Sequence, residues 1–286
     1  MINIYLIGNK GYTALKNLKK GHLSVISCVI IGQDKNVQND YSINIENFCI
    51  EKNLNYVIQN ETYQVTSQFS IAIGWRRLIN DDSKVIVFHD SLLPKYRGFN
   101  PLVTALLNGD KKIGVTALKA SNEYDRGEII KQESIQITYP IKIKKAIEKI
   151  SIVYANLLVN IVNKIVSNNL TFSPQDEAKA TYSLWRDSEN YKIDWTTEAD
   201  NIKRFVDAVG YPYKGAYTYI NGKKIIIKNV EVTNDVEISN REPGKVIFKN
   251  NASFVIVCGK GLLKINKFYN EKGEEVKFNN FRLRFK

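Results

Sequence analysis

The chain has 286 residues, of which 44% are hydrophobic and 24% are charged, a composition typical of globular proteins and not of disordered or fibrous ones. Its formal net charge of +12 favours an anionic partner such as a nucleotide, a polyglutamylated cofactor or RNA, without choosing among them. Apolar runs stay below the ~18 residues of a spanning helix and the first residues lack a charged leader, so we expect a cytoplasmic protein without a membrane partner.

Apolar runs alternate with amphipathic segments through the first 80 residues. The runs lie at residues 2–7, 24–31, 56–58 and 69–73, and the amphipathic segments at 12–20 and 43–53. Such runs, without strict polar alternation, predict parallel strands covered on both faces. Further strands are expected at 85–89 and 113–120 around a helix at 100–107, followed by a long amphipathic helix at 141–167. Residues 1–175 are therefore expected to form a doubly wound α/β domain.

The character of the sequence changes after residue 169. Residues 176–215 are polar and are expected to form a linker wrapped on the first domain, followed by a helix at 199–209. Residues 216–286 contain short β-type runs with Asn-Gly and Gly turns, which predict a small antiparallel barrel or sandwich. Residues 277–286 alternate apolar and basic side chains, which predicts an exposed edge strand. Pairing with a second copy would bury this strand, so we expect a homodimer; a nucleic-acid-binding tail is the alternative.

Few residues are suited to binding a metal. The chain has three cysteines, Cys28, Cys49 and Cys258, without a CxxC pair, and two histidines. This set argues against a structural zinc site and against a disulfide scaffold. We therefore expect no metal, and cysteines that belong to the core.

Residues 87–130 carry the strongest chemical signal. His89 ends a buried strand, a loop follows, and a second strand leads to a turn that contains Asp125. Ligands of open α/β sheets bind beyond the carboxyl ends of the strands, so His89 and Asp125 are expected to meet there as an acid/base pair. A hydrogen-bonded structural histidine and a turn-forming aspartate are the alternative.

The motif SLLPKYRG after a strand-end histidine, followed by GVT and D-x-G, resembles the formyltransferases that use 10-formyltetrahydrofolate. The similarity continues through QDEAKATY, KIDW, YPYKGAYT, PGKV and CGKGLLKI and covers residues 1–268. It implies a Rossmann-like catalytic domain, a small β-rich C-terminal domain and a reduced folate as co-substrate. The family's catalytic trio is an Asn, a His two residues later and the Asp of D-x-G, which correspond here to Val87, His89 and Asp125.

Val87 departs from this pattern, because valine cannot donate a hydrogen bond to the formyl oxygen. Asn100, a protonated His89 or a backbone N–H could replace the missing amide, a contribution often worth about 3 kcal/mol, or catalysis is weakened. In the resemblance-based assignment, His89 accepts the proton of the attacking amine and Asp125 orients it.

The family pattern implies that folate lies across the strand ends. The residues expected there are Ile73, Leu78, Leu92, Leu118, Ala120 and Asn122. An ordinary core role is the alternative for Leu92 and Leu118. The residues expected at the second substrate are Gly11, Tyr12, Trp75, Arg76, Arg77, Lys95 and Tyr96. An aromatic ring beside guanidinium groups suits a nucleotide diphosphate, and a solvated helix start is the alternative for Arg76 and Arg77.

Two branches of the resembled family differ in the amine that they formylate. The branch that acts on methionyl-tRNA carries a basic insertion after the second strand, whereas residues 32–48 here contain one Lys and three acidic residues. We therefore expect the amine of a nucleotide-linked amino sugar used in surface glycan synthesis, and no specific nucleic acid. The alternatives are a methionyl-tRNA formyltransferase and a catalytically impaired folate- or nucleotide-sugar-binding protein.

Overall fold

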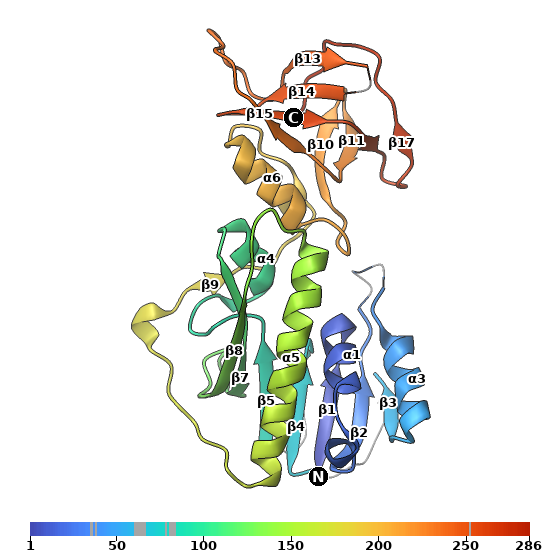
Figure 1. Cartoon of the computed structure of the whole chain (residues 1–286), viewed down its shortest axis with the longest axis vertical. Helices are drawn as coiled ribbons and strands as arrows, with labels where there is room; N and C mark the ends of the chain where they lie inside the picture. The colour runs from blue at the N-terminus through green and yellow to red at the C-terminus, as the bar shows by residue number, and fades with distance from the viewer. Residues whose placement is uncertain (35–36, 38, 60–66, 78, 80–83, 252) are drawn as a thin grey trace. The chain divides into compact units, whose positions relative to one another are not determined.

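The computed structural model describes residues 1–34, 37, 39–59, 67–77, 79, 84–251 and 253–286 (Figure 1). The chain divides into two compact units. The first contains Met1–Ala105, Lys111–Ile137 and Lys145–Trp185, and the second contains Leu106–Asp110, Thr138–Lys144 and Arg186–Lys286. The predicted domain limits at residues 175 and 215 stay a prediction.

A seven-stranded sheet forms the centre of the first unit, in the order β3-β2-β1-β4-β5-β7-β8. The first five strands in this order are parallel, and β7 and β8 run antiparallel to their neighbours. The strands are β1 (Ile2–Leu6), β2 (Ile26–Ile31), β3 (Tyr56–Ile58), β4 (Phe69–Ile73), β5 (Lys84–His89), β7 (Lys112–Lys119) and β8 (Ile129–Gln136). Strand β8, rich in polar residues, is an addition to the predicted set. The mixed α/β class is confirmed.

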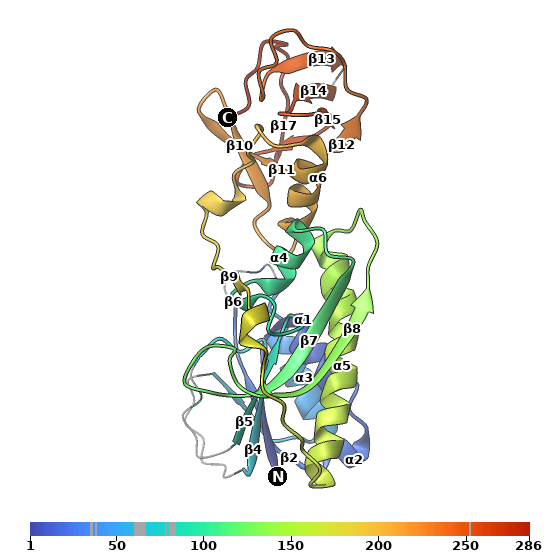
Figure 2. The same ribbon diagram turned by 90° about the vertical axis from the view of Figure 1, so that its left-hand side faces the viewer.

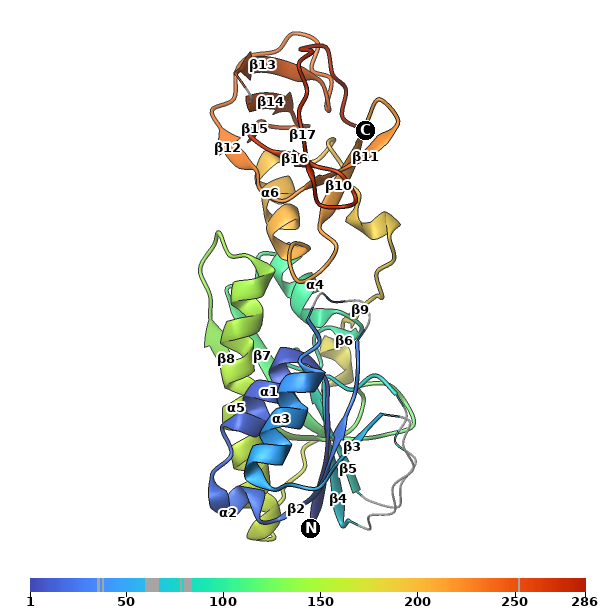
Figure 3. The ribbon, with the colours of Figure 1, turned by 90° about the vertical axis from the view of Figure 1, so that its right-hand side faces the viewer.

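Apart from α4 (Pro101–Leu107), the described helices of the first unit lie on one face of this sheet (Figures 2 and 3). They are α1 (Gly8–Lys16), the short α2 (Lys20–Leu23), α3 (Ser42–Lys52) and α5 (Ile143–Val166). In the described part of the chain, the other face carries loops instead of the helices expected there. On that face Tyr5, Cys28, Ile30 and Ala72 form an apolar cluster against which Val87 packs.

Helix α5 is the one helix among the described residues that is long and apolar enough to cross a membrane by length and composition. Half of its most apolar stretch is buried inside the structure, as in a core helix. Its inward residues, among them Ile150, Leu157 and Ile161, are fully buried. The predicted amphipathic helix therefore packs its apolar side on the core.

Strand β6 (Arg97–Gly98) pairs in parallel with β9 (Tyr182–Ser183), and α4 (Pro101–Leu107) follows β6. The 3-10 turn η1 (Glu177–Lys179) precedes β9. The first part of the polar segment predicted as a linker is thus hydrogen-bonded to the loop that follows His89. This pairing brings together residues that lie more than 80 positions apart in the sequence.

The second unit is rich in β-structure. It contains η2 (Glu189–Tyr191), α6 (Ala199–Ala208) and two four-stranded sheets. One sheet has the order β10 (Ala216–Ile220), β11 (Lys223–Ile227), β16 (Phe268–Tyr269) and β17 (Glu275–Val276), and the other β12 (Glu231–Thr233), β15 (Leu262–Ile265), β14 (Ser253–Val257) and β13 (Val246–Asn250). The hairpin turn between β10 and β11 is Asn221-Gly222, and both residues have the positive φ that a type I′ turn requires.

The C-terminal tail is not an exposed edge strand, so that prediction is wrong. Leu283 and Phe285 are buried, and Lys286 exchanges backbone hydrogen bonds of 2.8 and 3.0 Å with Tyr219. The N–H of Phe285 donates to the carbonyl of Gly244 at 2.7 Å. Because these residues pair within their own chain, the tail no longer supports the expected homodimer.

Cys28, Cys49 and Cys258 are all buried and unbridged, as predicted for core residues. Burial raises the pKa of Cys49 and of Cys258 to about 12. Within the described ranges, no group of three or more His, Cys, Asp or Glu side chains is arranged to hold a metal ion.

Candidate active site

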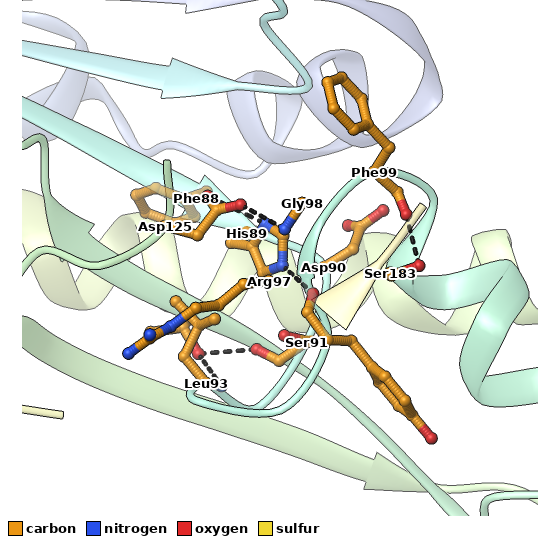
Figure 4. Close-up of polar contacts among 12 residues, drawn as sticks. Phe88, His89, Asp90, Ser91, Leu93, Arg97, Gly98, Phe99, Asp125 and Ser183 are labelled. Carbon is orange, nitrogen blue, oxygen red and sulfur yellow. Dashed lines mark hydrogen bonds and ion pairs between the residues drawn. The ribbon is translucent and has the colours of Figure 1, made fainter. Parts of the chain in front are cut away.

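His89 and Asp125 lie together in the first unit (Figure 4). His89 is the last residue of β5 and is 7% exposed, and its Nδ1 lies 3.3 Å from Oδ1 of Asp125. Oδ2 of Asp125 accepts a hydrogen bond from the Gly98 N–H at 2.8 Å. The strand before Asp125 is antiparallel to β5, and the N–H of Ala120 bonds to the carbonyl of Val85. The loop therefore leaves the sheet near the start of β5, and not beyond its carboxyl end as expected, and Asp125 reaches back to His89.

Both ring nitrogens of His89 face hydrogen-bond acceptors. Nε2 lies 2.8 Å from the backbone carbonyl oxygen of Tyr96, and Nδ1 faces the Asp125 carboxylate. A carbonyl oxygen and a carboxylate accept and do not donate, so a doubly protonated imidazolium satisfies both contacts. Both ring nitrogens therefore contact protein groups, and one of them must leave its partner before it can exchange a proton with a substrate.

The loop after His89 is held by side chains of the neighbouring β7 and β8. The hydroxyl of Thr116 donates to the carbonyl of Ser91 at 2.6 Å and accepts from the N–H of Leu93 at 3.0 Å. Gln132 Nε2 donates to the Leu93 carbonyl and to the Thr116 hydroxyl, both at 2.8 Å. The backbone of this loop is thus fixed by groups that lie outside the loop.

The Asn of the resembled family's catalytic trio is absent, and an apolar side chain, that of Val87, stands in its place. Val87 lies two residues before His89 on the same strand, and therefore on the same face of the sheet. Asn100, the proposed substitute, precedes α4 with φ of 50°, and its carbonyl accepts from the N–H of Thr104 at 3.0 Å. Its carboxamide has no hydrogen-bond partner among the described residues, and its role as a donor to the formyl oxygen stays a prediction.

A second polar cluster, which the sequence analysis missed, adjoins the pair. Asp90 follows His89, forms an ion pair with Lys10 of α1, and accepts a hydrogen bond from the hydroxyl of Tyr154 of α5. Burial alone would raise the pKa of Asp90, but Lys10, Tyr154 and His89 together hold that pKa below its usual value. Burial and the Asp90 charge raise the pKa of Tyr154 well above its usual value. The sequence signal for this cluster was the acidic residue Asp90 directly after the strand-end His89.

The residues predicted at the folate differ in exposure. Ile73 and Leu118 are fully buried strand residues, which fits the core role that was the alternative for Leu118. Leu92 is half-buried and packs over Gly114, where a Cβ atom would lie 2.5 Å from its Cδ2. Ala120 and Asn122 are exposed. Leu78 lies outside the described residues.

Gly11 and Tyr12, predicted at the second substrate, lie in the first part of α1. Gly11 is buried there, and the site of an added Cβ atom lies 3.0 Å from Cβ of Leu6, so Gly11 packs on β1. The ring of Tyr12 stacks on that of Tyr41, with 5.9 Å between centroids. The role of Gly11 and Tyr12 at the nucleotide stays a prediction.

The remaining residues predicted at the second substrate lie after β4 and β5. Trp75 is half-buried and its ring meets Tyr5 edge-on, with 5.1 Å between centroids. Arg76 is exposed but forms a 2.9 Å ion pair with Asp34, and Arg77 is exposed. The Lys95 ammonium lies 4.5 Å from the ring centroid of Tyr96, which is itself buried. These segments thus hold exposed cationic side chains beside largely buried rings.

Comparison with known proteins gives a consistent family. The sequence profile described as formyl transferase matches residues 13–162, and the profile of the formyl transferase C-terminal domain matches residues 186–285. A methionyl-tRNA formyltransferase of Streptococcus mutans serotype c is 32% identical over 217 residues, which are 71% of this chain and 68% of that protein. A methionyl-tRNA formyltransferase of Clostridium novyi is 34% identical over 182 residues, and the chain spans 58% of the length of that relative.

Two solved structures share the fold. The N-formyltransferase of Helicobacter canadensis, solved with folinic acid and dTDP-3-aminofucose, has a TM-score of 0.72 at 20% identity and covers 94% of this chain and 99% of its own. The methionyl-tRNA formyltransferase of Clostridium thermocellum has a TM-score of 0.55 at 16% identity and covers 82% of this chain and 94% of its own. With both profiles matched in order and the fold shared, the chain belongs to the formyl transferase family.

Proposed function

We propose that the chain transfers the formyl group of 10-formyltetrahydrofolate to the amine of a nucleotide-linked amino sugar. The observation that carries the chemistry is His89, buried at the end of β5 between the Asp125 carboxylate and the Tyr96 carbonyl. A polarisable, charge-bearing ring held in one orientation suits a reaction that creates and removes charge at a carbonyl group.

The reaction needs one proton to move from the amine to the folate. Attack by the amine nitrogen forms the new C–N bond and places negative charge on the formyl oxygen, which the His89 imidazolium stabilises. Collapse breaks the bond between the formyl carbon and N10, and N10 takes up a proton as the folate leaves. Once Nε2 of His89 has left the Tyr96 carbonyl, it can deliver this proton to N10 and then take one from the attacking amine, while Asp125 at Nδ1 keeps the ring oriented.

The choice of an amino sugar over tRNA rests on charge placement. In residues 32–48 the three acidic side chains outnumber the one Lys, and Asp34 already neutralises Arg76. Asp40 turns its carboxylate onto its own segment, where it accepts from the N–H groups of Asp34 and Ser42. A segment with this charge does not suit the phosphate backbone of tRNA, which binds to clustered cations. The Helicobacter canadensis enzyme, solved with a folate and a nucleotide-linked amino sugar, supports the same substrate classes here.

Methionyl-tRNA formyl transfer is the second candidate, because the relatives at 32% identity carry that name. A direct assay separates the two. Purified protein is supplied with 10-formyltetrahydrofolate and either a panel of nucleotide-linked amino sugars or methionyl-tRNA. We expect N-formyl product from at least one sugar. Specific, salt-resistant formylation of methionyl-tRNA would reject the proposal in favour of the second candidate.

The assay also addresses the impaired-enzyme alternative motivated by Val87. Binding of folate and nucleotide sugar without turnover would identify a binding protein. The proposal further includes a cytoplasmic enzyme of surface glycan synthesis, and the expected homodimer needs a different contact from the C-terminal tail, which pairs within its own chain. Light scattering on the purified protein measures the oligomeric state independently of its activity.

A further inference from the structure

Residues 173–183, called here the crossing segment, join the two loops that carry His89's partners. Its first residue, Ser173, exchanges backbone hydrogen bonds of 2.8 and 2.9 Å with Ile129, just after the Asp125 turn. Near its end, the carbonyl and the hydroxyl of Thr181 accept from the N–H groups of Arg97 and Tyr96, at 2.8 and 2.9 Å. The crossing segment therefore contacts both the loop after β5 and the turn after β7.

Gln175, the third residue of the crossing segment, makes hydrogen bonds to both loops. Its Oε1 accepts from Nε and Nη2 of Arg97 at 3.1 and 2.8 Å. Its Nε2 donates to the backbone carbonyls of Asp125 and Gly127 at 2.7 and 2.8 Å. The carboxamide thus uses its acceptor on one loop and both donors on the other, which no charged side chain of this length could do.

The Arg97 end of this bridge is itself fixed. Its side chain is 1% exposed, and it donates to both carboxylate oxygens of Glu177 at 2.7 and 2.8 Å. Such a two-point contact between guanidinium and carboxylate sets distance and direction together. Gln175 is therefore held against an immobile partner, and not against a flexible surface side chain.

At the other side of Gln175 lies the turn that contains Asp125 and Gly127, whose backbone is tightly constrained. Asp125 has φ of 56°, a left-handed conformation that is uncommon for residues other than glycine. Gly127 follows so closely behind that an added Cβ would lie 1.7 Å from the carbonyl oxygen of Lys119. The direction of the Asp125 side chain depends on this compact turn, and Gln175 binds the turn at two of its carbonyls.

We infer that Gln175 is a positioning residue for Asp125. It holds the turn so that one carboxylate oxygen meets His89 and the other meets the Gly98 N–H. The catalytic part of this inference rests on the proposed function, while the structural part can be tested without any substrate.

Two substitutions separate the contacts. Gln175→Glu keeps an acceptor for Arg97 but replaces the donors by an oxygen that repels the carbonyls of Asp125 and Gly127. Gln175→Met keeps the length and removes both contacts. Gln68→Glu is the matched control. It makes the same chemical change at an exposed residue directly before β4, at the end of the sheet opposite to His89.

Two measurements are made on each variant. In steady-state assays we expect kcat for formyl transfer to fall by about 10- to 100-fold in both Gln175 variants, with KM within about twofold. Misplacing a catalytic group by about 1 Å can lower the rate of the chemical step by about 100-fold. In NMR spectra without substrate, we expect the ring resonances of His89 to move. His22, the other histidine, bonds to Asn163 and is the internal reference.

The outcomes are distinct. Unchanged His89 resonances in both folded variants, with unchanged His22, would overturn the inference. So would a change confined to KM. If the resonances of His89 move while the wild-type protein formylates neither sugar nor tRNA, the positioning role stands and the proposed function fails.

Discussion

Two segments follow neighbouring parallel strands at the same edge of the sheet, and they are built differently. Residues 90–99, after β5, are hydrogen-bonded to β7, β8 and the crossing segment, and His89 at the end of β5 is buried. Residues 74–77, after β4, end in two exposed arginines, and the side chain of Arg76 is 58% exposed even though it is paired. The groups assigned to the chemistry are thus fixed before any ligand binds, whereas the groups assigned to the substrate's charge remain adjustable.

The largest effect is expected when either member of the fixed pair, His89 or Asp125, is replaced. His89→Asn and Asp125→Asn should each lower kcat by about 10²- to 10⁴-fold, because each removes a member of the acid/base pair. His22→Asn is the matched control, since His22 bonds to Asn163 at 3.1 Å on the surface. Circular dichroism verifies folding. Near-normal kcat in both folded variants would mean that the site has been assigned wrongly.

Val87 tests whether the fixed segment lacks a donor. If the oxyanion has no partner, Val87→Asn should raise kcat by up to about 10²- to 10³-fold, and if another group already serves it, the rate should change little. The structure favours the smaller change, because the Asn100 carboxamide has no hydrogen-bond partner among the described residues and His89 lies two residues after Val87 on the same face of the sheet. Asn100→Ala in the wild-type background distinguishes these two donors: a loss of rate identifies Asn100.

The adjustable segment is tested by charge removal. Arg76→Ala and Arg77→Ala together should raise KM for the nucleotide sugar about tenfold or more, with folate KM and kcat nearly unchanged, because a diphosphate is bound equally before and during the reaction. Arg282→Ala with Arg284→Ala removes the same charge from the second unit and serves as control. An equal rise in folate KM would move these arginines to the folate site.

The smallest expected effect concerns acid stability. Hydrogen bonds from Arg97 lower the pKa of Glu177 from 4.5 to about 2. A carboxylate whose pKa is lower in the folded state stabilises the protein above its unfolded pKa, and this stabilisation is lost as pH falls from 4.5 towards 2. Glu177→Gln should therefore reduce the difference in unfolding free energy between pH 6 and pH 3. Urea denaturation at both values measures it, and an unchanged difference would contradict this ion pair.

Much of the fold was predictable because it depends on short stretches of sequence. The parallel strands are buried apolar runs, α5 shows a three-to-four spacing, and Asn221-Gly222 marks its hairpin. The prediction for the C-terminal tail was wrong because an alternation of apolar and basic residues is the same whether the strand pairs within its own chain or with another copy. That distinction depends on contacts with Tyr219 and Gly244, far away in the sequence.

The candidate site was only partly predictable. His89 and Asp125 stand out as residue types at strand ends, but Lys10, Tyr154 and Gln175 act through partners 48 to 80 positions away. QDEAKATY was visible as a motif, yet its polar composition is equally typical of a surface linker. Such residues become recognisable when tertiary contacts show which backbone groups they satisfy.

The buried cysteines provide reporters of local opening without any engineered label. Cys28 on β2 and Cys49 on α3 belong to the first unit, and Cys258 belongs to the second. A thiol that is both covered and hard to ionise reacts with an alkylating reagent only while its surroundings are open, since the thiolate is the reactive form. The alkylation rate of each cysteine, followed by mass spectrometry, therefore reports how often its own unit opens, and a substrate that closes the first unit alone would slow two of the three rates.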